Sequence, residues 1–222
     1  MIEKFYASTS AGQVHGRRIA GRGVPVVLLH RTPVSSAGFE PVLRFLAHAG
    51  QAAIALDTPG FGSSFMPQGA PSTVDYGRWL LEALDALGVA RFHLAAHHTG
   101  THFAAEIAAA APARVASLTL SGLILAPPEE RAKMRRDIGH APALDAAGSY
   151  VSDTFKLMKS LFLDPVPELV HAETMGALTA GRGRDLAFDA IFAQDFESVL
   201  RRALAGGLRA QVVQAGDDPL TL

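Results

Sequence analysis

The first 125 residues alternate between short apolar runs and longer stretches with helical spacing. Residues 24–29 form an apolar run that is typical of a strand buried on both faces. Apolar residues three and four positions apart predict a helix over 35–49. The same alternation predicts strands at 51–56, 92–96 and 115–120, and helices at 73–87 and 101–110. Strands and helices that alternate at this spacing predict a parallel sheet with helices on both faces.

The pattern changes after residue 125. From 126 to 206 the sequence carries helical periodicity and no strand signal, and an apolar run then returns at 210–214. We therefore expect a first core part at 1–125, a helical cap inserted at 126–206, and a last core segment at 207–222. The helices of the insertion are expected at 129–137, 149–163, 167–180 and 185–205.

Composition narrows the class of protein. A chain of 222 residues fits one domain at roughly 150 residues per domain, and 49% apolar against 18% charged residues excludes a disordered chain. A net charge of −1 gives no basic excess for nucleic acid, and no apolar stretch approaches the length of about 18 residues that a membrane span needs. The chain has no cysteine, which excludes thiolate chemistry. We expect a cytoplasmic protein with a small-molecule substrate, no cofactor, and no nucleic-acid or membrane partner; a homodimer stays open.

Three loops that follow expected strands carry recognisable motifs. Residues 28–33 read Leu-Leu-His-Arg-Thr-Pro, residues 57–64 read Asp-Thr-Pro-Gly-Phe-Gly-Ser-Ser, and residues 216–219 read Gly-Asp-Asp-Pro. Together they resemble the α/β-hydrolase superfamily, which has His-Gly-x-Pro, Asp-x-Pro-Gly-x-Gly-x-Ser and an acid loop in this order. The resemblance implies an α/β fold: a mostly parallel α/β-hydrolase sheet with helices on both faces and a helical cap insertion.

The fourth motif departs from the family. Members carry the nucleophile in Gly-x-Ser-x-Gly on a strained turn between a strand and a helix. Here the segment reads Ala96-His97-His98-Thr99-Gly100, so that His98 stands in place of the serine. The resemblance implies that the turn exposes His98 above the sheet. It also implies an oxyanion hole made by the backbone N–H groups of Thr99 and Thr32.

A histidine at this position allows three interpretations. Imidazole has an unperturbed pKa near 6.5, and the adjacent helix N-terminus favours its neutral form, so His98 can act as a general base. It can also attack directly and form an acyl-imidazole, or it fills a former active site in a ligand-binding protein. The leading prediction is a hydrolase of a small ester, lactone or related carbonyl compound. Lyase or isomerase chemistry with His98 as general base, and a non-catalytic ligand-binding member of the fold, are the alternatives.

The resemblance implies an acid near the end of the sequence and, after it, the histidine of the family's triad of nucleophile, acid and histidine. Asp218 is the preferred acid, and Asp217 is the second candidate. The family order places a histidine some tens of residues after the acid, whereas the sequence ends at Leu222. We therefore expect either a longer natural chain, with a histidine about 25–30 residues past Asp218, or a triad that has been abandoned.

Residues in the segments 28–33 and 96–100 are candidates for contact with the substrate. His30 occupies the position that supports the oxyanion loop by hydrogen bonding, and His97 directly precedes His98; both are expected to be more structural than chemical. Arg31 replaces the family's glycine. Its guanidinium could hold a substrate carboxylate through two hydrogen bonds, or it could turn to solvent.

Two further features of the sequence are weighed. His98 and His102 have the i, i+4 spacing of metal ligands, but no third ligand is evident, and no metal site is predicted. The large apolar residues of the insertion predict an apolar ceiling over the pocket, which favours a small apolar substrate. These residues are Phe155, Met158, Phe162, Met175, Phe188 and Phe192.

Overall fold

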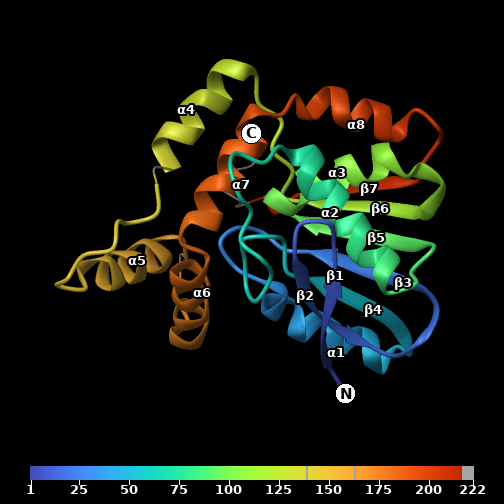
Figure 1. Cartoon of the computed structure of the whole chain (residues 1–222), viewed down its shortest axis with the longest axis horizontal. Coiled ribbons are helices and arrows are strands. Elements are labelled where there is room, and N and C mark those ends of the chain that lie inside the picture. Colours follow the sequence, from blue (N-terminus) through green and yellow to red (C-terminus); the bar gives the residue numbers. More distant parts are fainter. Residues whose placement is uncertain (139, 163, 217–222) are drawn as a thin grey trace.

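The central sheet of the computed structural model has seven strands, and the structure describes residues 1–138, 140–162 and 164–216 (Figure 1). The strands are β1 (Glu3–Ser8), β2 (Gln13–Ile19), β3 (Arg22–Leu29), β4 (Gln51–Leu56), β5 (Phe92–His97), β6 (Val115–Ser121) and β7 (Ala210–Val213). They lie in the order β1-β2-β4-β3-β5-β6-β7. The neighbours β1–β2 and β2–β4 are antiparallel, and the four remaining pairs of neighbours, from β4–β3 to β6–β7, are parallel. The predicted mostly parallel sheet is confirmed.

The hairpin of β1 and β2 is the part of the sheet that apolar runs do not indicate. Both strands are rich in polar residues, and β1 keeps most of its side chains at least partly exposed. Antiparallel strands at a sheet edge need only one buried face, so they lack the continuous apolar run of a central parallel strand. The apolar-run criterion therefore finds β3 to β7 and misses this hairpin.

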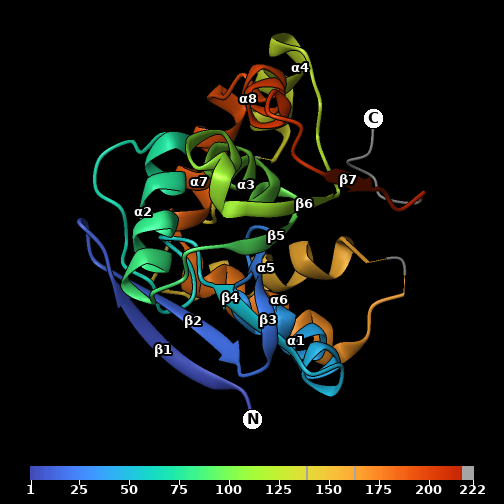
Figure 2. The same ribbon diagram turned by 90° about the vertical axis from the view of Figure 1, so that its right-hand side faces the viewer.

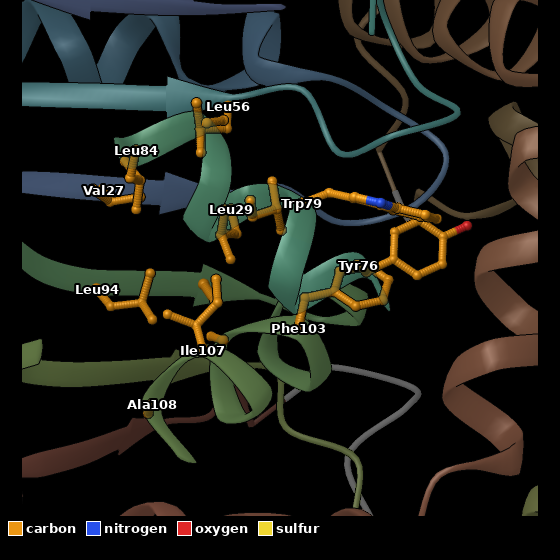
Figure 3. Close-up of a cluster of buried hydrophobic side chains, with 14 of the residues drawn as sticks. Val27, Leu29, Leu56, Tyr76, Trp79, Leu84, Leu94, Phe103, Ile107 and Ala108 are labelled. Atoms are coloured by element: carbon orange, nitrogen blue, oxygen red, sulfur yellow. The ribbon is translucent and has the colours of Figure 1, made fainter. Parts of the chain in front are cut away.

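Helices cover both faces of the sheet (Figure 2). They include α1 (Glu40–His48), α2 (Thr73–Ala86) and α3 (Thr99–Ala110), with short 3₁₀ turns at Ser36–Phe39 and Pro112–Arg114. Side chains of β3 alternate between the two faces: Val27 and Leu29 join the cluster with α2 and α3, while Leu28 joins the smaller cluster with α1. Figure 3 shows the larger cluster, in which the strand side chains meet Leu84 and Ile107.

The insertion is helical, as predicted, with one division that the periodicity does not show. Its helices are α4 (Pro128–Ile138), α5 (Ser149–Ser160), α6 (Pro167–Ala180), α7 (Arg182–Ala193) and α8 (Phe196–Leu204). The single helix expected over 185–205 is interrupted because Gln194 is extended, with φ −72° and ψ 136°. Asp195 then caps α8 by accepting a hydrogen bond from the Ser198 N–H.

The two halves of the insertion pack differently. Helix α8 lies against α3, where Phe196 and Val199 form a buried cluster with Ala105 and Leu123. Helix α7 contributes Ala187, Ala190 and Ile191 to the main core. Helices α4 and α5 instead extend beyond the sheet (Figure 1). None of the helices in the described part of the chain combines the length and the apolar character needed to cross a bilayer.

Candidate active site

A strained turn joins β5 to α3 at His98. Its backbone has φ 45° and ψ −117°, and it is the one residue other than glycine with a positive φ in the part of the chain that the structure describes. The His98 N–H donates to the Ser121 carbonyl at 2.8 Å, and the His98 carbonyl accepts from the N–H of Thr101 at 2.8 Å. Such a conformation costs about 1–3 kcal/mol and persists only where surrounding structure holds it, typically at functional sites.

Glycine at position 100 allows the N-terminus of α3 to approach the end of β3. A Cβ atom there would lie 2.6 Å from the Leu29 carbonyl oxygen and 2.8 Å from that of His30. These are backbone atoms, so a side chain could be accommodated only if the helix or the strand moved. The close approach places Thr99, in the first turn of α3, beside the loop that follows β3.

The imidazole of His98 lies over the residue that follows β6. A Cβ atom added to Gly122 would be 2.8 Å from Cε1 and 2.9 Å from Nε2 of His98. The rings of His97 and His98 are 4.3 Å apart between centroids. The half-buried imidazole is thus at the carboxyl ends of β5 and β6, the edge at which open α/β sheets bind their ligands.

The two expected oxyanion-hole residues lie together. The Thr32 N–H donates to the side-chain Oγ1 of Thr99 at 2.7 Å, and Thr99 is 4% exposed. The Thr32 donor therefore points at an oxygen atom at the positive end of α3. Both backbone N–H groups are expected donors from the sequence, whereas the Thr99 hydroxyl, which accepts from the Thr32 N–H in the structure, has no role in that expectation.

His30 holds the loop that carries Thr32. Its Nε2 accepts from the Thr58 N–H at 2.9 Å, which places the proton on Nδ1, and Nδ1 donates to the Arg31 carbonyl at 2.9 Å. Burial lowers the pKa of His30, which maintains this neutral form. The ring is 3% exposed, and both of its nitrogens are bonded within the protein.

Arg31 pairs with a carboxylate of the insertion. Its Nη2 atom lies 2.6 Å from Oε2 of Glu173 on α6, and the side chains are 22% and 9% exposed. The two orientations considered from the sequence were contact with a substrate carboxylate and exposure to solvent. Nothing in the sequence near either residue indicates this pairing.

The carboxylate of Asp57 is buried between the segment after β3 and the loop at residues 57–64. Asp57 accepts hydrogen bonds from the Ser36 N–H at 2.7 Å and the Ser63 N–H at 3.0 Å, and its Oδ2 is 2.7 Å from His15 Nδ1. Burial raises the pKa of Asp57, but the bond from Ser36 and the other interactions outweigh it and the net pKa is lowered. An ionised Asp57 therefore anchors the start of the motif loop at residues 57–64.

The His102 side chain belongs to a buried row of hydrogen-bonded side chains between α3 and the junction of α7 and α8. Its Nδ1 donates to Oε1 of Gln194 at 2.6 Å, and Nε2 of Gln194 donates to Glu106 at 2.6 Å. The His102 ring packs on Phe196 with 4.3 Å between centroids. Burial lowers the pKa of His102 to about 4. Within the described residues, no three histidine, aspartate or glutamate side chains gather as a metal centre would require.

We expect His102 to make the fold sensitive to acid. Its pKa is near 6.5 in the unfolded chain and about 4 when folded, so between these values the unfolded state binds more protons. The contribution of His102 to the free energy of unfolding is fully present above pH 6.5 and is lost as the pH drops towards 4. Between pH 7 and pH 5 this loss amounts to about 2 kcal/mol. Urea unfolding at the two pH values measures this difference.

The matched variant for that measurement is His102→Asn, which keeps a donor towards Gln194 and does not titrate. The lowered pKa of His30 acts in the same direction in both proteins, so the difference between them isolates His102. An equal loss of stability in the variant would contradict the prediction.

Asp217 and Asp218 lie outside the described residues. The strand that precedes them, β7, ends at Val213, whose carbonyl accepts a hydrogen bond from the Gly122 N–H at 3.0 Å. Gly122 is the residue over which the His98 imidazole lies. The end of β7 is thus hydrogen-bonded to Gly122, the residue that lies against the His98 ring.

The apolar residues of the insertion do not behave as one group. Met158 is buried, and Phe188 and Phe192 pack against the main core with their rings stacked 5.9 Å apart. Phe155 and Met175 are about half exposed. The predicted apolar ceiling is therefore divided between core packing and surface.

Comparison with known proteins identifies the family of the chain and solved structures of the same fold. A family model described as alpha/beta hydrolase fold matches residues 24–161, which is more than half of the chain. The 2-hydroxy-6-oxononadienedioate/2-hydroxy-6-oxononatrienedioate hydrolase of Burkholderia vietnamiensis strain G4 is 35% identical over 102 residues, 44% of this chain and 35% of that protein. Matches to the curated relatives span less than two thirds of their lengths.

Solved structures show the same architecture at low identity. The epoxide hydrolase VrEH1 of Vigna radiata superposes with a TM-score of 0.75 at 18% identity, covering 96% of this chain and 79% of that one. A structure of the N-acyl homoserine lactonase AidH superposes with a TM-score of 0.75 at 22% identity, covering 99% and 80%. At these identities the likeness concerns the fold alone.

Proposed function

The chain belongs to the α/β-hydrolase fold family, and from that premise we propose that it hydrolyses a small ester, lactone or related carbonyl compound with His98 in the position of the nucleophile. The observation that carries the proposal is the turn at His98. A strained backbone presents an imidazole at the carboxyl edge of the sheet, beside an N–H donor already aimed at an oxygen atom. Relatives named as hydrolases support the general reaction class.

In the proposed reaction, the neutral His98 imidazole removes a proton from a water molecule as the water oxygen attacks the substrate carbonyl carbon. The π electrons of the carbonyl move to its oxygen, and the backbone N–H groups of Thr32 and Thr99 stabilise that oxyanion. Collapse of the intermediate breaks the bond to the alkoxide, which takes the proton from the imidazolium. The products are a carboxylic acid and an alcohol, and His98 is neutral again.

Asp218, with Asp217 as the second candidate, is the proposed acid partner of this imidazole. The end of β7 beside Gly122 supports an acid loop on this side of the ring. A carboxylate there would stabilise the imidazolium that forms during the reaction.

The Thr99 hydroxyl must give up the Thr32 N–H when a substrate oxygen takes its place. We expect Thr99→Ala to raise kcat/KM about threefold to tenfold, because the substrate no longer competes for a hydrogen bond of about 1 kcal/mol. The same change should lower stability by about 1–2 kcal/mol, because the part-buried Thr32 N–H loses its acceptor. Thr99→Ser keeps the hydroxyl and serves as the control. A fall in activity in the alanine protein alone would show that the hydroxyl itself assists the reaction.

A panel of p-nitrophenyl esters and lactones, assayed at several pH values, tests the proposed function. We expect turnover whose kcat/KM rises with pH as the catalytic imidazole loses its proton. A burst of nitrophenol followed by slow turnover would identify the acyl-imidazole route in place of the general-base route. Binding without turnover across the panel would overturn the proposal in favour of a ligand-binding protein.

A further inference from the structure

Arg31 and Glu173 form a charge pair between the oxyanion loop and the insertion. Arg31 directly precedes Thr32, whose N–H is a proposed oxyanion donor, and Glu173 lies on α6 with 9% of its side chain exposed. One turn further along α6, a Cβ atom added to Gly176 would be 3.4 Å from the carbonyl oxygen of Pro33. The pair is therefore held where α6 lies against the loop.

The contact leaves part of the guanidinium available. Nη2 of Arg31 lies 2.6 Å from Oε2 of Glu173, but Oε2 accepts no well-aligned hydrogen bond among the described residues. The pair is thus an end-on ion pair and not the two-bonded fork that arginine and a carboxylate can form. The other N–H groups of Arg31, which is 22% exposed, make no hydrogen bond to a described side chain or carbonyl.

The charge of the pair decides which ligand group fits it. Arg31 alone would attract a substrate carboxylate, but Glu173 already neutralises it. A second carboxylate would either face the first as a like charge or displace it, leaving Glu173 buried and unpaired, which is strongly unfavourable. A neutral oxygen, such as that of a carbonyl, amide or ester, can accept from the remaining N–H groups without either cost.

We propose that the Arg31–Glu173 pair determines substrate specificity, so that the site accepts acyl groups with a neutral oxygen acceptor and rejects acyl groups with a carboxylate. This inference rests on the proposed hydrolase function and specifies the substrate class of that same site. Glu173 is the element that rejects a carboxylate, and Arg31 is the donor that binds the neutral oxygen.

Three esters and two variants test the proposal. The esters are p-nitrophenyl pentanoate, methyl p-nitrophenyl glutarate and mono-p-nitrophenyl glutarate, which differ at the far end of the acyl chain by a methyl group, a neutral ester and a carboxylate. For the native protein we expect kcat/KM to be highest for the methyl ester and at least tenfold lower for the carboxylate. Glu173→Gln should raise kcat/KM for the carboxylate ester relative to the pentanoate by at least tenfold, because Arg31 is then free to bind it.

The double variant Arg31→Gln, Glu173→Gln is the matched control. It keeps an uncharged pair and lacks the arginine, so the gain for the carboxylate ester should disappear. Thermal unfolding of each protein shows whether the fold is retained. An unchanged ester ratio in a folded Glu173→Gln protein would overturn the proposal.

A binding measurement separates this proposal from the proposed function. The shift in unfolding temperature with glutarate and with glutaramide reports binding without any turnover. We expect glutarate to stabilise Glu173→Gln more than the native protein, and glutaramide to stabilise both equally. If no ester is hydrolysed but this difference is found, the hydrolase proposal fails and the charge selection stands. If esters are hydrolysed and the difference is missing, the charge selection fails alone.

Discussion

Replacing His98 by alanine is expected to lower kcat/KM for the best ester of the panel about 10³-fold, while the protein stays folded. The imidazole is the group that would take the proton from water, and general-base catalysis contributes about 10²–10⁴-fold. The backbone N–H groups of Thr32 and Thr99 remain in the variant, so some catalysis by oxyanion stabilisation should persist. Initial rates over a pH series provide the measurement, and the rise of kcat/KM with pH should disappear with the side chain.

Two companion variants make that result specific. His48→Ala removes an exposed imidazole on α1 whose partner among the described residues is the Arg44 carbonyl of its own helix, and it should leave the rate unchanged. His98→Gly should be as inactive as His98→Ala but about 1 kcal/mol more stable, because glycine adopts a φ of 45° without strain. A rate unchanged by His98→Ala would refute a catalytic role for His98.

The parallel strands β3 to β6 could be predicted because most of their side chains are buried or partly buried on both faces. Such strands need continuous apolar sequence, so the runs at 51–56 and 115–120 coincide with β4 and β6 to within a residue. The hairpin of β1 and β2 gives no such signal, because β1 is exposed along most of its length and both strands are rich in polar residues. The break between α7 and α8 was not predicted, because the helical periodicity continues through Asp195. Asp195 nevertheless acts as the N-cap of α8.

The site could be predicted only where its geometry is local. The turn at His98 is encoded by one stretch of chain, which comprises β5 and the residues up to Gly100, and the structure places Thr32 beside it. The partners of Arg31 and His102 were not predictable, because Glu173 and Gln194 approach them only after the insertion has folded. Buried polar pairs between distant segments leave no periodic pattern in a single sequence.

Gly100→Ala is expected to damage both the fold and the site. The new Cβ would lie 2.6 Å from the Leu29 carbonyl oxygen and 3.0 Å from the Leu29 carbonyl carbon, closer than such atoms can pack. Because backbone atoms cannot rotate away, the start of α3 must move from the end of β3. We expect a loss of about 3 kcal/mol in unfolding free energy, at the upper end of the range for overpacked sites.

The same displacement separates the two oxyanion donors, since Thr99 belongs to the helix and Thr32 to the loop after β3. A misplacement of about 1 Å can cost 10²-fold in rate, so kcat/KM should fall by at least that factor in the fraction that remains folded. Gly206→Ala is the matched control: no atom lies within 4 Å of its added Cβ, and stability and activity should both be kept. A stable and fully active Gly100→Ala protein would mean that the helix and the strand do not approach as closely as the proposed oxyanion hole requires.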